Sequence, residues 1–233
     1  MNKMLAILGS TAVLTAFAGV ANAQETITGP VNAPRNAAEI GVGLGYSQPA
    51  GNLTRRGGDA VADIARGGGE VNAEVGYRID SHWLVGLYGG YGQYHAPGGT
   101  SSDIVNTANG GIQGQYHIMP FQRVDPWISL GVGYRGFFTT PDNGATRALH
   151  GLQLARARVG VDYRVSETVA LGPVIGMDLT MFTSEHVPGA GGQLAAVGSD
   201  NVTVTPFFFA GIGGKFDIGS ERERSERMVA QRY

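Results

Sequence analysis

The chain has 233 residues, a formal net charge of -2 and no cysteine. Charged residues make up only 15% of it, against roughly 25% in ordinary soluble domains. This balance argues against a basic nucleic-acid-binding protein. The lack of cysteine excludes disulfides, zinc–thiolate sites and cysteine nucleophiles in this chain.

The first 23 residues have the three parts of a secretory signal peptide. Lys3 supplies a positive start, an apolar run of small residues covers 5–20, and Ala21-Asn22-Ala23 matches an A-x-A cleavage site. An uncleaved membrane-anchoring helix is the alternative. We expect residues 24–38, with Pro30 and Pro34, to form an unstructured periplasmic leader after export.

Strict alternation of apolar and polar residues dominates the chain after residue 38, which indicates β-strands. In LARARVGVDYRV (154–165), Arg156 and Arg158 alternate with Ala155, Ala157 and Val159. Eight segments share this period: 39–47, 70–80, 83–94, 103–118, 127–138, 154–165, 169–182 and 201–218. Most exceed the roughly 5 to 6 residues of an average strand and match the roughly 9 to 11 that cross a bilayer at a tilt.

The connections between these segments are alternately longer (48–69, 95–102, 139–150, 183–200) and mostly shorter (81–82, 119–126, 166–168), as in transmembrane barrels. Aromatic residues fall near both ends of the segments, as expected at two lipid–water interfaces: Tyr77, Trp83, Tyr116, Tyr163 and Phe216, and Tyr46, Tyr91, Tyr134 and Phe138. Strands can cross lipid only as a closed barrel, so we predict an all-β, eight-stranded, antiparallel up-and-down transmembrane β-barrel over 39–218. The alternative is an exported soluble sandwich or lipocalin-like barrel, whose apolar faces would point inward.

This pattern resembles the small eight-stranded outer-membrane barrels of Gram-negative bacteria, the OmpA/OmpX/OmpW-like group. In the final GGKFDI of the last segment, Gly213, Phe216 and Ile218 resemble the glycine-x-x-aromatic-x-hydrophobic signal read by the barrel assembly machinery. The sequence departs from it in that Ile218 replaces the usual aromatic and further residues follow. The resemblance implies an outer-membrane location, Sec export, and contacts with the assembly machinery, outer-membrane lipids and lipopolysaccharide.

The polar faces place charged residues of both signs in the expected lumen: Glu39, Glu70, Glu74, Arg78, Arg135, Arg156, Arg158, Asp162, Arg164, Asp178, Lys215 and Asp217. An unpaired buried charge costs several kcal/mol, so we predict a salt-bridge and hydrogen-bond network that plugs the lumen. For the arginines of 154–165 the candidate partners are Glu39, Glu70, Glu74 and Asp178. A narrow channel or small-solute site is the alternative, because the inward glycines leave room for water.

No catalytic or cofactor motif appears in the sequence. There is no Gly-x-Ser-x-Gly elbow and no helical His-x-x-x-His pair, and the histidines that could act as bases are scattered, at His95, His117, His150 and His186. We therefore expect a non-enzymatic protein without a metal or cofactor and with a structural role in the envelope. Nothing in the sequence indicates an oligomeric state.

The first long connection is rich in glycine and arginine. Arg55 and Arg56 are candidate ligands for lipopolysaccharide phosphates, and a solvated loop is the alternative. Residues 59–65 suit one or two helical turns. The segment 219–233 mixes Glu and Arg without an apolar stripe, which predicts a disordered or frayed helical periplasmic tail.

Overall fold

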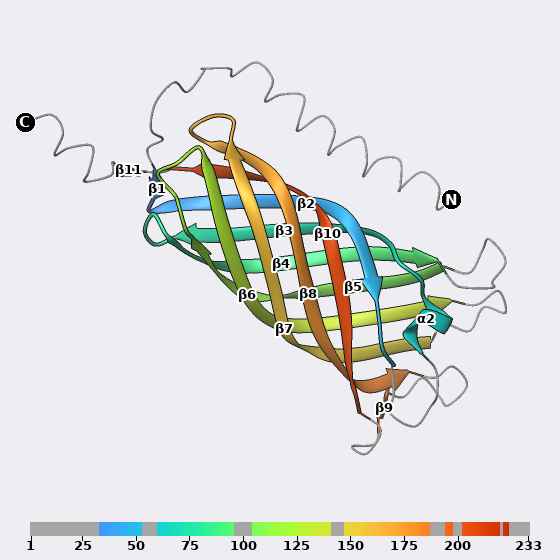
Figure 1. Ribbon diagram of the computed structural model, residues 1–233. Coiled ribbons are helices and arrows are strands. Elements are labelled where there is room, and N and C mark those ends of the chain that lie inside the picture. The colour runs from blue at the N-terminus through green and yellow to red at the C-terminus, as the bar shows by residue number, and fades with distance from the viewer. Residues whose placement is uncertain are drawn as a thin grey trace, which may run out of the picture.

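The protein is a closed antiparallel barrel (Figure 1). The computed structural model describes residues 33–52, 60–95, 104–140, 147–186, 194–197, 202–219 and 221–223. The barrel strands are β2 (Ala37–Pro49), β3 (Gly68–Arg78), β4 (Trp83–His95), β5 (Ile104–His117), β6 (Val124–Thr140), β7 (Arg147–Arg164), β8 (Val169–His186) and β10 (Val204–Ile218). Each pairs with its neighbours in the sequence. The predicted eight-stranded antiparallel barrel is confirmed.

Pairing between the first and last barrel strands closes the sheet. β10 pairs with β8 on one side and with β2 on the other, in a register that runs from Phe207–Pro49 to Ile218–Ala38. An open sheet would leave a row of unpaired N–H and C=O groups, which is costly in lipid. Closure therefore lets the barrel expose apolar side chains to a bilayer.

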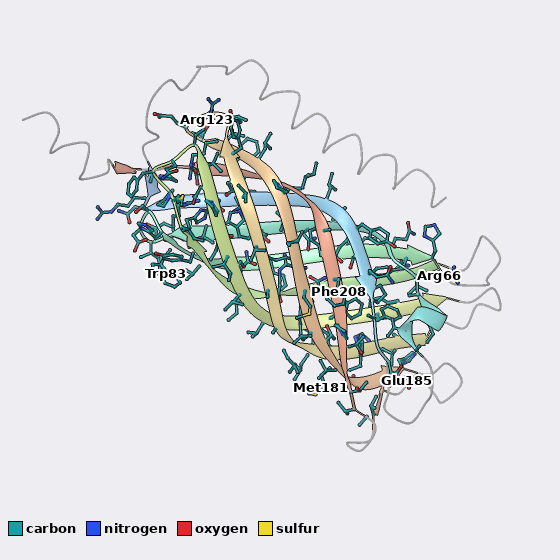
Figure 2. All side chains as sticks on the ribbon, viewed as in Figure 1. Arg66, Trp83, Arg123, Met181, Glu185 and Phe208 are labelled. Carbon is teal, nitrogen blue, oxygen red and sulfur yellow. The ribbon has the colours of Figure 1, made fainter. Side chains whose placement is uncertain are left out.

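The two ends of the barrel differ. At the turn end, short connections at 79–82, 118–123 and 165–168 join the strands, and β1 (Ala33–Arg35) pairs with β11 (Glu221–Glu223) beside them. At the loop end lie the helix α2 (Val61–Ile64) and β9 (Leu194–Ala196), which pairs antiparallel with the last three residues of β8. Figure 1 shows β1 and β11 at one end of the barrel and α2 at the other. In Figure 2, Trp83 and Arg123 mark the turn end, and Arg66 and Glu185 mark the loop end.

The apolar side chains point outward. A belt of exposed aliphatic residues covers mid-barrel, including Leu87, Ile112, Leu130, Val132, Ile175 and Ile212. Exposed aromatics flank it, with Tyr77, Trp83 and Tyr163 toward the turn end and Tyr46, Tyr91 and Tyr134 toward the loop end. Among the described residues no helix is both long and apolar enough to cross a membrane. The apolar belt rules out the alternative of a soluble sandwich with an apolar interior, and the barrel is of the transmembrane type.

β7 begins at Arg147, well before the predicted position of 154, because a bulge interrupts the alternation on which the prediction rests. Gln153 is buried, Leu154 is exposed, Ala155 is half-buried and Arg156 is buried again, so inward-facing residues change from odd to even numbers. The register of β7 against β8 shifts between Gln153 and Ala155. A period-2 pattern cannot be followed through a bulge. For this reason the sequence pattern predicted only the second half of β7.

Other strand limits also differ from the prediction. β6 begins at Val124 rather than at 127, and β8 continues to His186 rather than ending at 182. β2 begins at Ala37, inside the expected leader 24–38. The pair of β1 with β11, which joins that leader to the charged tail, was not predicted from the sequence. The expected helical turn within 59–65 is present as α2.

Candidate functional site: the barrel lumen

The candidate site is the polar lumen, because charged residues of six of the eight barrel strands, all except β4 and β5, meet there. Every charged residue predicted to face inward is buried, except Glu74, whose side chain is 21% exposed. These side chains form two clusters along the barrel axis, and a third, apolar cluster lies at the loop end.

The turn-end cluster is a chain of ion pairs between β2, β3, β7 and β10. The Arg78 guanidinium donates to the Glu39 carboxylate, with 2.5 Å between Nη2 and Oε2. Arg164 donates to Asp217 (3.2 Å), which also lies 3.5 Å from Nε of Arg78. Lys215 donates to Asp162 over 2.9 Å. A buried charge is tolerated only when it is paired in this way.

His117 sits fully buried within the turn-end cluster. Its Nδ1 lies 2.6 Å from a carboxylate oxygen of Asp125, and its Nε2 lies 3.0 Å from Nη2 of Arg78. A guanidinium can only donate, so Nε2 is the accepting nitrogen and Nδ1 carries the proton that is donated to Asp125. Histidine is therefore neutral here and links Arg78 to β6.

The middle cluster contains more arginines than carboxylates in direct contact with them. Asp178 accepts hydrogen bonds from both guanidinium Nη atoms of Arg158 (2.6 and 3.0 Å) and from Arg135 (2.5 Å). Arg156 donates to Glu74 over 3.0 Å and to the side-chain oxygen of Asn72 over 3.2 Å. Three arginines thus share two carboxylates.

Aromatic faces cover several of these cations. Arg156 lies over Tyr88 and Arg135 over Phe207, each with 4.2 Å from Cζ to the ring centroid. Lys215 lies over Trp127, with 3.8 Å from Nζ to the centroid. Cation–π contacts strengthen when they are shielded from water. The rings therefore fill the lumen and stabilise the charges at the same time.

The loop-end cluster closes the other side of the lumen with apolar side chains. It consists of Val61, Ala65, Tyr94, Val105, Phe137, Leu149, Phe182 and Phe207, with Ile64 packed against it. Phe137 lies near the centre, with its ring centroid 6.2 Å from that of Phe182 and 6.4 Å from that of Phe207. The residues of α2 pack onto these rings from the first long connection.

The partners of the arginines in 154–165 agree only in part with the candidates from the sequence. Glu74 and Asp178 pair with Arg156 and Arg158. Arg164 pairs instead with Asp217, and Glu39 pairs with Arg78. Glu70 has no arginine partner among its described contacts and accepts a 3.4 Å hydrogen bond from the hydroxyl of Tyr94.

Several lumen residues were not predicted from the sequence. Asp125 was assigned to a connection, although it continues the odd-numbered inward face of Trp127 and Ser129. Gln153, which accepts a 2.9 Å hydrogen bond from Tyr88, was hidden by the bulge. The loop-end cluster had no sequence signal, because its phenylalanines come from three separate strands. Arg55 and Arg56 lie outside the described residues. Gly213, Phe216 and Ile218 lie in β10.

The candidate histidines are not assembled into one site. His95 is exposed at the loop end, His150 is half-buried beside Tyr134 and Phe138 on the outer wall, and His186 ends β8. His117 contacts Asp125 but is fully buried. Within the described part of the chain, no group of three or more His, Cys, Asp or Glu residues is arranged to hold a metal ion.

Comparison with known proteins gives matches at the level of structure. Neisserial surface protein A superposes with a TM-score of 0.50 at 13% identity, over 77% of this chain and 96% of that one. The fold is that of the small eight-stranded outer-membrane barrels. The outer membrane protein OprG from Pseudomonas aeruginosa (TM-score 0.48, 16% identity, 79% of this chain and 98% of that one) and AlkL (0.48, 15%, 83% and 95%) are also similar. No family model and no curated protein matches the sequence. At these identities, the likeness shows the barrel fold alone.

Proposed function

We propose that the protein is a non-enzymatic outer-membrane barrel with a structural role in the envelope, whose lumen is plugged by its own side chains. The observation that carries this proposal is the filling of the lumen. Large charged side chains such as Arg78, Arg135, Arg156 and Arg164 are at most 1% exposed although they face the inside of the barrel. An eight-stranded barrel is just wide enough for side chains to fill it.

Both ends of the lumen support the same reading. At the turn end the ion-paired cluster is nearly inaccessible to solvent, and at the loop end the aromatic rings and α2 cover the lumen. A route for solutes would need water-lined space between these clusters. A cavity in the lumen, lined by Asn72, Arg156 and Lys215 among others, measures about 40 Å³, which is room for a water molecule or two rather than for a solute.

The orientation and partners belong to the same proposal. The signal peptide 1–23 would direct export and be cleaved after Ala23, so that the turn end faces the periplasm and the loop end faces outward. The barrel assembly machinery would recognise the end of β10 at Gly213, Phe216 and Ile218. Arg55 and Arg56 would bind lipopolysaccharide phosphates beside the outer leaflet.

Planar-bilayer recording tests the plug. We expect no discrete conductance from the wild-type protein, and we expect Arg156→Ala to lower the temperature at which the folded gel band shifts. Arg66→Ala, which changes an exposed arginine outside the lumen, is the matched control and should change neither. If the wild-type protein conducts, and the conductance changes in Arg156→Ala or Arg158→Ala, the proposal of a plugged lumen is wrong. The alternative, a narrow channel for a small solute, would then hold.

A further inference from the structure

The turn-end cluster contains a buried histidine–carboxylate pair, His117 and Asp125. His117 ends β5, Asp125 lies at the start of β6, and both are fully buried. Nδ1 of His117 lies 2.6 Å from Oδ2 of Asp125, and Oδ1 of Asp125 accepts a 3.0 Å hydrogen bond from the backbone N–H of Met119. Imidazole is the side chain whose ordinary pKa, about 6.5, lies close to neutral pH, so this pair is a candidate proton site.

Two donors point at the other ring nitrogen of His117. Nη2 of Arg78 lies 3.0 Å from Nε2, and the side-chain amide nitrogen of Gln115 lies 2.5 Å from it. A guanidinium can only donate, so Nε2 carries no proton while Arg78 occupies this place. The carbonyl oxygen of the Gln115 amide is buried without a hydrogen-bond partner among the described residues. Rotation of this amide would turn that oxygen, an acceptor, towards Nε2.

A second proton on the pair has to reside on Nε2. In an imidazolium beside a carboxylate, Nδ1 keeps its proton for Asp125 and the new proton is on Nε2. If Asp125 is instead a neutral acid that donates to Nδ1, the remaining ring proton is again on Nε2. Two protons between Nδ1 and Oδ2 would set donor against donor across 2.6 Å. In either arrangement, the proton on Nε2 displaces the guanidinium of Arg78.

Arg78 connects several elements of the cluster. Its guanidinium donates to Glu39 on β2, lies 3.5 Å from Asp217 on β10, and donates to the carbonyl of Ser81 in the turn 79–82 over 3.3 Å. Through Nε2 of His117 it also reaches β5. Loss of that acceptor leaves a buried, charged donor unpaired, which is costly. Displacement of Arg78 would therefore loosen the turn-end cluster.

The charge around His117 favours the uptake of one proton. The cations of the cluster are Arg78, Arg164 and Lys215, and its carboxylates are Glu39, Asp125, Asp162 and Asp217. His82, in the turn before β4, is a further titratable neighbour. Three cations thus face four carboxylates, and one additional proton balances them in a region shielded from water.

We propose that the pair of His117 and Asp125 is a proton-dependent switch at the turn end of the lumen. In the closed arrangement the pair holds one proton, and Arg78 donates to Nε2. In the open arrangement it holds two, the amide of Gln115 accepts from Nε2, and Arg78 is released. The open arrangement binds the additional proton, so acidification favours it, by up to about tenfold per pH unit. This inference rests on the proposed plug and names the condition that loosens it.

Fluorescence of Trp127 measures the opening of the cluster. Trp127 lies opposite His117 in the register of β5 with β6, is buried, and donates to Asp162 over 2.7 Å. The chain has two tryptophans, and Trp83→Phe, at an exposed position, leaves Trp127 alone. In this variant, refolded in lipid vesicles, we lower the pH from about 8 to about 4, across the ordinary histidine pKa. We expect emission at longer wavelength and about twofold stronger quenching by acrylamide, as water reaches the ring.

Three substitutions in the Trp83→Phe variant separate the pair from other titrating groups. His117→Gln retains an acceptor for Arg78 but takes up no proton, so the change in Trp127 should disappear. Asp125→Asn removes the carboxylate that stabilises the additional proton, so the midpoint should move to lower pH. His95→Gln, at an exposed position at the loop end, is the matched control and should retain the transition.

NMR of the ring nitrogens of His117 supplies a measurement that needs no substitution in the pair. We expect Nε2 to be unprotonated at about pH 8 and to gain its proton together with the change in Trp127. The proposal is overturned if Nε2 stays unprotonated through that change, if Trp127 does not change, or if the change persists unaltered in His117→Gln. A wild-type conductance at neutral pH would contradict the plug alone, so the switch and the plug can fail separately.

Discussion

At the scale of single residues, the lumen depends on carboxylates that serve more than one cation. Asp178 is the clearest case, since it accepts hydrogen bonds from Arg158 and Arg135 while only 1% exposed. Glu74 pairs with Arg156 alone and remains partly accessible. The energetic consequence of losing a carboxylate should therefore differ between these two positions.

We predict that Asp178→Asn lowers the free energy of unfolding by about 3 to 5 kcal/mol, because it leaves two buried guanidinium groups without a counter-charge. Glu74→Gln is the comparison and should cost clearly less, since its carboxylate pairs with one arginine and is partly accessible. Urea titration of the protein in lipid vesicles measures both values. Equal losses for the two variants would contradict the proposed sharing of Asp178.

At the scale of elements, α2 shows how a short segment is held in place by what it covers. An isolated helix of four residues has no stability of its own. It is fixed by the N–H of Val61 donating to the carbonyl of Gly51, whose φ of +80° suits glycine, and by the N–H of Arg66 donating to the carbonyl of His95. Burial of Val61 and Ala65 on the loop-end cluster completes the attachment.

Replacement of Val61 by aspartate should detach α2 from the loop end. An unpaired carboxylate among Tyr94, Phe137 and Phe207 would be strongly disfavoured, and the segment would leave the cluster. We expect proteinase K to cut the first connection of Val61→Asp at least tenfold faster than that of the wild type, while the barrel stays intact. Arg66→Asp, at an exposed position in the same segment, serves as control. If both variants are cut at the wild-type rate, α2 is not held by the cluster.

At the scale of the whole molecule, the barrel is inside-out compared with a soluble protein. Leu130 and Ile212 are 62% and 66% exposed, whereas charged side chains of the lumen are buried. This distribution is stable only when lipid covers the belt. The molecule as a whole therefore gains its stability from two surroundings, the bilayer outside and the paired charges inside.

The depth of the belt can be measured by inserting a charge into it. Leu130→Arg, near the middle of β6, should destabilise the barrel in vesicles by about 2 to 4 kcal/mol. Met119→Arg should have little effect, since Met119 lies in the turn 118–123, where a long cation reaches water. A comparable loss for both variants in urea titrations would place the turn end inside the hydrocarbon region and contradict this assignment of the belt.

The class of fold and most of the inward-facing residues could be predicted from the alternation in the sequence alone. Alternation has period 2 in any strand, so a pattern such as Arg156, Arg158 against Ala157, Val159 reveals its two faces without knowledge of the partner strands. The apolar belt, the two aromatic levels and the inward charges all follow from this local rule. Where a bulge changes the phase, at Leu154 and Ala155, the same rule failed.

Which charged residues pair with one another depends on the tertiary structure. Arg156 pairs with Glu74, which lies 82 positions away in the sequence, and Arg78 on β3 pairs with Glu39 on the neighbouring strand β2. These pairs form because the strand register sets the height of each side chain in the lumen. Glu70 was a candidate on equal terms but lies beside Tyr94. The loop-end cluster likewise arises from residues of several strands. Burial and pairing across a closed barrel are not local properties, so no periodicity in the chain encodes them directly.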